Sequence, residues 1–161
     1  MKLLIRFVLL LAALTLAGCG FHLREAKPLS PTLSRVQIEA SDPFSTVPLA
    51  LARALRERGA AVGPGAGASV LKITRDEAVT EPLTIGGQAR VQEYRVILRI
   101  TFELRDADGK VLLDSTTIER QRDYRFDETQ ALGASSEDER VRDELRREQI
   151  YALLRALEAV R

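Results

Sequence analysis

The sequence predicts one α+β domain over residues 34–161, a two-layer sandwich with two helices on one face of a four-stranded mixed sheet. Three patterns predict this fold. Apolar and polar residues alternate over residues 91–105, as in a half-buried strand. Apolar residues recur at helical spacing over residues 46–58 and again from residue 136 onward. With the remaining strands the order is β-α-β-β-β-α, and both helical stripes can be buried in one core.

The first half of the domain contains a strand, a helix and a second strand. Residues 35–40 alternate between apolar and polar side chains and stop at a Ser-Asp-Pro turn, so they form a strand. Ser45 or Thr46 caps the helix that follows, and Gly59 closes it. The second strand is expected over residues 69–79.

Residues 80–89 are predicted to be a long connection, because Gly86 and Gly87 allow the chain to bend. Leu83 and Ile85 are apolar where a loop tip is usually polar. Two interpretations remain open. Either these side chains contact a partner, or the loop folds back and Leu83 covers the local core.

The second half of the domain is predicted to be a hairpin followed by a long helix. On the strand 91–105, one face is apolar and is formed by Tyr94, Val96, Leu98, Ile100, Phe102 and Leu104. Asp106 to Gly109 supply the turn, and residues 111–126 return as the partner strand. A capping box, Ser136-Glu137-Asp138-Glu139, is expected to begin the last helix. The opposite sheet face stays polar.

The first 18 residues have the features of a cleaved secretory signal. Lys2 and Arg6 are followed by the uncharged residues 7–16. This run is too short for the ~20 apolar residues that a bilayer core requires, so residues 1–18 are expected to be removed.

The signal ends in Leu16-Ala17-Gly18-Cys19, which resembles a bacterial lipobox. This resemblance implies that Cys19 is acylated and becomes the first residue of the mature chain. More than one acyl chain gives a lasting anchor. Residues 19–33 would then form the lipidated N-terminus and a tether. Gly20 stands where an inner-membrane retention signal commonly has Asp, which favours the outer membrane.

The composition of the mature chain argues against several functions. Removal of the signal leaves 143 residues with 22 basic and 23 acidic side chains, so no general attraction to nucleic acid is expected. Cys19 is the only cysteine and His22, in the tether, the only histidine. The glycine-rich residues 63–67 lack the Lys-Ser/Thr pair of a nucleotide loop. We therefore expect no catalytic, metal or cofactor site, although Arg95, Arg99 and Glu103 share the polar face and form either a site or a solvated surface.

The residues around the cleavage site, Leu16-Ala17-Gly18-Cys19-Gly20-Phe21-His22-Leu23-Arg24, resemble the LPS-assembly lipoprotein family LptE. Similar features continue along the chain: the first helix ending at Gly59, Glu93-Tyr94 at the start of the long strand, and Gln130-Ala131-Leu132 before the last helix. The predicted order of elements also fits.

The resemblance implies a lipoprotein on the periplasmic face of the outer membrane. It would plug the LptD β-barrel, help it to assemble, and take part in lipopolysaccharide transport. Lipopolysaccharide would be bound by Arg90 and Arg95, and the barrel would be contacted by Leu83 and Ile85. The family's second basic position falls near Ala134, where this chain has no cation. The alternative is an auxiliary lipoprotein of another envelope lipid-transport system.

Overall fold

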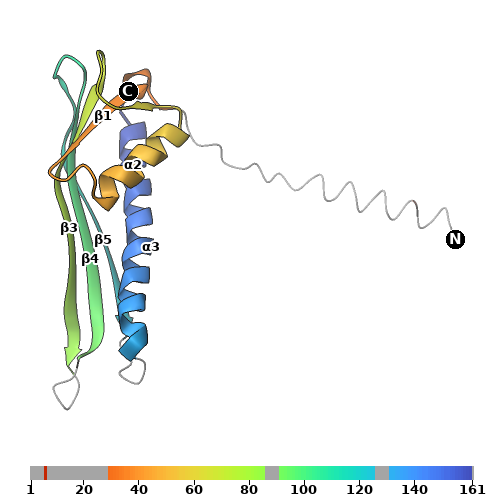
Figure 1. Cartoon of the computed structure of the whole chain (residues 1–161), viewed down its shortest axis with the longest axis vertical. Coiled ribbons are helices and arrows are strands. Elements are labelled where there is room, and N and C mark those ends of the chain that lie inside the picture. Colours follow the sequence, from red (N-terminus) through yellow and green to blue (C-terminus); the bar gives the residue numbers. More distant parts are fainter. Residues whose placement is uncertain (1–5, 7–28, 86–90, 126–130, 161) are drawn as a thin grey trace.

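A computed structural model describes residue 6 and residues 29–85, 91–125 and 131–160. Figure 1 shows a twisted sheet with two helices against one of its faces. The elements are η1 (Pro31–Leu33), β1 (Arg35–Ala40), α2 (Thr46–Glu57), β2 (Ala61–Val62), β3 (Ser69–Ile85), β4 (Val91–Arg105), β5 (Val111–Arg125) and α3 (Ala131–Glu158). The predicted α+β class, with two helices on one side of a mixed sheet, is confirmed.

The sheet has five strands in the order β2-β1-β3-β4-β5, one more than predicted. β1 is parallel to both β2 and β3, whereas β3, β4 and β5 form an antiparallel meander. The additional strand, β2, contains only Ala61 and Val62. Two residues are too few to display the alternation by which strands are recognised in a sequence.

β3 is longer than predicted, so the proposed loop over residues 80–89 is wrong for its first six residues. The strand extends to Ile85, and Ile85 is paired with Val91 of β4. The long strand β4 offers pairing partners to this whole segment, which decides its conformation. Beyond Ile73, β3 has no strand on its other side within the described ranges. Pro82, which lacks an N–H, therefore lies on a free edge, where proline is tolerated.

α2 buries one face against the sheet, as predicted from its spacing. The buried side chains include Val47, Leu51 and Leu55. Ser45 occupies the N-cap position, although its side chain makes no capping hydrogen bond. Gly59 follows the helix with φ of 87°, a conformation that glycine adopts without steric cost.

α3 begins at Ala131, so the prediction that a capping box at Ser136 starts this helix is wrong. Ala131 and Leu132 favour helix, and no proline or other strong break separates them from Ser136. The expected buried stripe is confirmed by Val141, Leu145, Ile150, Leu153, Leu154 and Leu157, each at most 7% exposed. Gln149 is also buried, and its Nε2 donates a hydrogen bond to the carbonyl of Ile118 at 3.2 Å.

The space between helices and sheet contains two separate apolar clusters. The larger cluster, the proximal core, lies between α2, the C-terminal half of α3 and the strand segments beside them. It includes Leu33, Leu71, Phe102 and Leu157. Leu29, the first described residue of the domain, packs against this core. The distal cluster is small and consists of Val96, Leu98, Val141 and Leu145, with Tyr124 against it.

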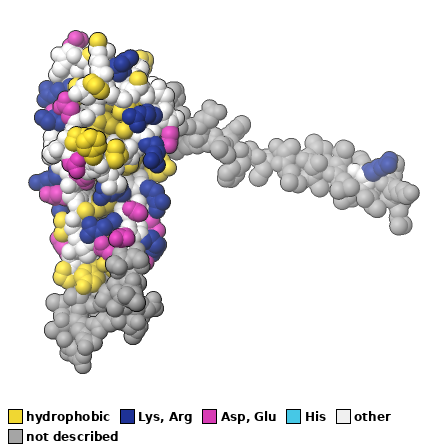
Figure 2. Space-filling view, in the orientation of Figure 1, with side chains coloured by type: hydrophobic (Ala, Val, Ile, Leu, Met, Phe, Trp, Pro, Cys, Tyr) yellow, Lys and Arg dark blue, Asp and Glu magenta, His cyan; other side chains and the backbone are white. Residues whose placement is uncertain are grey.

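The opposite sheet face is polar, as the alternation in β4 predicts. Across β4 and β5, Arg95 faces Asp123, Arg99 faces Glu119 and Thr101 faces Thr117. Figure 2 shows acidic and basic side chains distributed along the length of the molecule. Among the described helices, none is long and apolar enough to cross a membrane.

Candidate functional site

The sites predicted from the sequence fall mainly at the distal end of the molecule, where β3 ends, β4 begins, β5 ends and α3 begins (Figure 1). Cys19 and Arg90 lie outside the described residues. Leu83 and Ile85 lie at the C-terminal end of β3, and Arg95 lies near the start of β4. The structure therefore places Leu83, Ile85 and Arg95 on adjoining strands.

Arg95 is held by an acidic neighbour on the polar face. Its Nε and Nη2 donate hydrogen bonds to the two carboxylate oxygens of Asp123 at 2.7 and 2.8 Å. These bonds raise the pKa of Arg95 and lower that of Asp123. Glu81 of β3 is the register partner of Arg95 on its other side. An anionic ligand of Arg95 would therefore have to compete with Asp123.

Leu83 presents an apolar side chain to solvent at the end of β3. Its side chain is 40% exposed, and the pairing of β3 with β4 shifts register on either side of Thr84. Such irregularities twist a strand locally and change the direction of its side chains. The alternative in which Leu83 covers the local core does not agree with this exposure. A contact surface remains the interpretation to be tested.

The polar residues Arg95, Arg99 and Glu103 do not come together as a site. Arg99 donates to Glu119 at 2.5 Å, and Arg105 donates to Glu103 at 3.3 Å. Each charge is balanced by a neighbour in the sheet, so this face is an ion-paired surface. Within the described ranges, no group of three His, Cys, Asp or Glu side chains could hold a metal ion.

A network of side-chain hydrogen bonds between α3 and the strands at the distal end was not predicted. Asp138 of α3 accepts hydrogen bonds from Tyr124 at 3.2 Å and Thr80 at 3.0 Å. Arg142 donates to Asp138 at 2.5 Å and to Thr80 at 2.6 Å. These contacts join α3 to both β3 and β5. The sequence signal was the i,i+4 spacing of Asp138 and Arg142, which the assignment of Asp138 to a capping box obscured.

Tyr124 is the titratable group that this network perturbs most clearly. Burial, followed by the neighbouring Asp138 carboxylate, raises the pKa of Tyr124 to about 12. Its ring also stacks on Tyr94, with ring centroids 5.6 Å apart and an interplanar angle of 21°. The stack lies on the helix side of the sheet and covers the distal apolar cluster.

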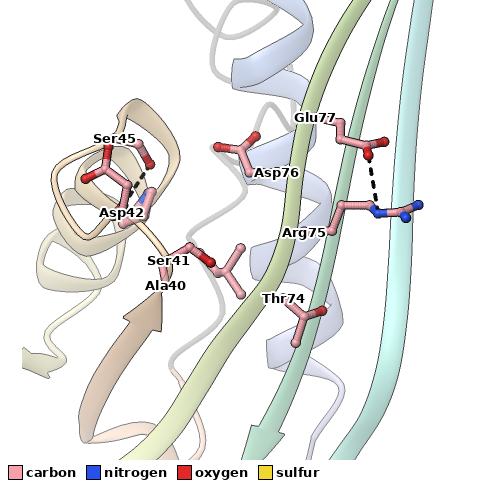
Figure 3. Close-up of a pocket in the computed structure, with 10 residues that line it drawn as sticks. Ala40, Ser41, Asp42, Ser45, Thr74, Arg75, Asp76 and Glu77 are labelled. Atoms are coloured by element: carbon pink, nitrogen blue, oxygen red, sulfur yellow. Dashed lines mark hydrogen bonds and ion pairs between the residues drawn. The ribbon is translucent and has the colours of Figure 1, made fainter.

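β3 continues past the end of β1, which leaves space beside β3 where it has no neighbouring strand. A cavity of about 430 Å³ lies there between the start of α2 and β3 (Figure 3). Asp76 points toward the α2 side, whereas Arg75 and Glu77 point to the other side and contact each other at 3.5 Å. Burial raises the pKa of Asp76, and Arg146 partly offsets this effect. None of the predicted site residues lines this cavity.

The comparison with protein families identifies the fold and its relatives. The model of the family LptE, described as lipopolysaccharide-assembly, matches residues 33–157. The chain belongs to the LptE family. The match covers all five strands, all of α2, and α3 as far as Leu157.

Two LptE proteins from bacteria are similar to this chain over most of their length. The LPS-assembly lipoprotein LptE of Photorhabdus laumondii is 26% identical over 149 residues, which cover 91% of this chain and 81% of that protein. The LPS-assembly lipoprotein LptE of Pectobacterium atrosepticum is 26% identical over 157 residues, covering 96% and 84%. The family is named for lipopolysaccharide assembly rather than for catalysis.

A solved structure shares the fold. The solution structure of lipoprotein B from Nitrosomonas europaea superposes with a TM-score of 0.71 and 24% identity. It covers 87% of this chain and 91% of the other. The two-layer arrangement of helices on a mixed sheet is therefore that of known lipoproteins.

Proposed function

We propose that this LptE-family chain is an outer-membrane lipoprotein that plugs the LptD β-barrel, helps it to assemble, and takes part in delivering lipopolysaccharide to the cell surface. The family match over residues 33–157 carries this proposal. In it, acylated Cys19 anchors the chain at the periplasmic face. The ion-paired sheet face supports the proposal, because the interior of a large barrel is polar and wet.

The proposed barrel contact is formed by Leu83 and Ile85. The 40% exposure of Leu83 supports it, since an exposed leucine at the end of a strand has apolar area left to bury on a partner. Lipopolysaccharide is proposed to bind near Arg90 and Arg95. Guanidinium groups form charge-assisted, often bidentate hydrogen bonds with phosphates, and lipid A carries phosphates.

Affinity purification of the full chain from outer membranes tests the proposal. We expect LptD to be the dominant protein that remains bound. A lipid-transport complex of the inner membrane in its place would favour the alternative, an auxiliary lipoprotein of another envelope system.

The substitution Leu83→Asp tests the proposed contact itself. A carboxylate at this position cannot be buried against an apolar wall without a large desolvation cost, so recovery of LptD should fall. Val111→Asp is a matched control, because Val111 has the same 40% exposure but lies at the opposite end of the sheet. Equal recovery of LptD with both variants would contradict the assigned role of Leu83.

A further inference from the structure

A groove between α2 and α3 plays no part in the function proposed above. It has a volume of about 350 Å³ and runs between α2 and the C-terminal half of α3. Ala50 and Ala54, four residues apart, leave space along α2. Ile150 and Leu154, also four residues apart, form the apolar wall on α3. Residues at this spacing lie on one helix face, so small and apolar residues line the floor of the groove on both helices, with Ile150 and Leu154 only 7% and 1% exposed.

The rim of this helix groove carries basic side chains that lack acidic partners. Arg53 of α2 and Arg147 of α3 line it and are both exposed. Neither forms an ion pair with any residue of the described part of the chain. Arg58, also on the rim, is paired with Glu158. Glu57 adds one carboxylate, so the two unpaired arginines leave the rim net positive.

Tyr151 stands beside these arginines with its side chain 62% exposed. An aromatic ring with a polar hydroxyl suits a boundary between hydrocarbon and water. Figure 2 shows hydrophobic side chains over the part of the molecule that carries α2, with Lys and Arg side chains among them. An apolar floor, an aromatic rim and free guanidinium groups together fit a ligand with a hydrocarbon part and an anionic part.

The size of the helix groove suits part of a small ligand. Its volume of about 350 Å³ falls in the range of ~300–1,000 Å³ that small-ligand pockets occupy. The chain length also agrees, since the ten residues from Cys19 to Leu29 reach at most ~36 Å. Because Leu29 packs on the same core as Ile150 and Leu154, an anchored chain would keep this groove near the membrane.

We propose that the helix groove between α2 and α3 holds one acyl chain of the lipid A part of lipopolysaccharide, with Arg53 and Arg147 binding a lipid A phosphate. The choice of lipopolysaccharide rests on the function proposed above. This contact is separate from the distal end, because it lies on the helices beside the proximal core. The chain would therefore hold its lipid at two places, one by charge near Arg95 and one by both charge and hydrocarbon burial.

Photocrosslinking in cells tests this proposal with the full chain. A benzophenone amino acid in place of Tyr151 should crosslink to lipopolysaccharide, detected by antibody and by mass spectrometry of the adduct. The same group in place of Leu49 is a positional control, since Leu49 is 54% exposed on α2 but does not line the groove. We expect a lipopolysaccharide adduct at position 151 and none above background at position 49, because of these two residues only Tyr151 lines the groove.

The arginines are tested in the same background. Arg53→Gln with Arg147→Gln should reduce the lipopolysaccharide adduct at position 151 to the level of the Leu49 control. Arg56→Gln with Arg155→Gln removes the same charge from exposed positions outside the groove and should leave the adduct unchanged. All four side chains are exposed, so these variants are expected to fold.

Several outcomes would overturn the assignment. A protein adduct at position 151 would make the groove a protein interface, and a phospholipid adduct alone would give it a different lipid. Absence of any lipid adduct, or equal loss with both arginine pairs, would also overturn it. Recovery of LptD with the unsubstituted chain is measured in parallel. Loss of that recovery contradicts the proposed function, whereas a missing adduct with LptD still bound contradicts only the groove.

Discussion

At the scale of single residues, the charged side chains of β4 on the polar face are each paired with an oppositely charged neighbour. Arg95 is the instructive case, because the alternation in β4 predicted which face it occupies but not that Asp123 would bind it. Which residues of β4 and β5 face each other depends on register, and register is set by the hairpin turn. A sequence pattern with period two assigns the face of a residue but does not name its cross-strand partner.

The pair suggests a test of the proposed lipopolysaccharide contact. Arg95→Gln should weaken lipopolysaccharide binding by the full chain, whereas Asp123→Asn should strengthen it, because the guanidinium no longer has a competing carboxylate. Binding at low and high salt measures both effects, and they should shrink as salt screens the charges. Melting temperatures should change little, since exposed pairs contribute little to stability. Weaker binding in Asp123→Asn would argue against a direct role for Arg95.

Tyr124 gives a prediction for alkaline pH. Its folded pKa of about 12 lies above the ordinary value of 10. The stabilisation from its neutral hydroxyl is therefore fully present below pH 10 and is lost as the pH rises from 10 to 12. Denaturant unfolding across this range should show the advantage of the unsubstituted chain over Tyr124→Phe shrinking. Tyr151→Phe, at an exposed position, serves as the control, and an advantage that stays constant with pH would contradict the assignment.

At the scale of elements, hydrophobic patterns that continue along a helix or strand predicted that element correctly. Turn and cap signals at the ends of elements did not predict where the elements end. β4 alternates along most of its length, so the burial of Val96, Leu98, Ile100, Phe102 and Leu104 was predicted, whereas Ile97, buried on the opposite face, was not. The end of β3 was misjudged because pairing with β4 extended the strand, and the start of α3 was misjudged because Ala131 and Leu132 favour helix before the expected cap. Pro82 and the two glycines after Ile85 suggested a loop, but β4 supplied a partner strand. Ser136 suggested a helix start, but residues 131–135 continue the helix.

The division of α3 between two clusters predicts uneven stability along one helix. Leu145 is buried in the small distal cluster and Leu157 in the larger proximal core. Replacing either leucine by alanine should cost roughly 2–5 kcal/mol of unfolding free energy. Leu145→Ala should open mainly the distal half, because few other apolar contacts hold it there.

Hydrogen exchange distinguishes local from global opening in these variants. Leu145→Ala should speed exchange in the first turns of α3 and the distal parts of β4 and β5, while α2 stays protected. Leu157→Ala should speed exchange in α2 as well. Identical exchange patterns in the two variants would mean that the two clusters unfold as one unit.

At the scale of the whole molecule, the sequence predicted the class, the helix layer and the polar face, but not the fifth strand. The two residues of β2 form a strand only because β1 lies beside them. The distal network around Asp138 was missed for a related reason, since Thr80, Tyr124 and Asp138 come from three elements far apart in the sequence. Such contacts follow from how the elements are stacked, which no single segment encodes.

The anchor can be tested on the whole chain. Cys19→Ala removes the only sulfur that could carry lipid. We expect cells fed a fatty-acid analogue to label the unsubstituted chain and not this variant, which should leave the membrane fraction or stay uncleaved. Equal labelling of both chains would contradict the lipid anchor.

The proximal core unites the two ends of the domain, and this has a consequence for the order of folding. Leu33, near the start, and Leu157, near the end, are buried in the same cluster. The β3–β4–β5 meander needs only short loops to close, whereas joining Leu33 to Leu157 closes a loop of nearly the whole domain at a greater cost in chain entropy. The meander can therefore form early, while the segment next to the tether is fixed only after the last helix has been synthesised. A chain that ends before Leu157 would keep its hairpins but lose the packing that positions its own N-terminus.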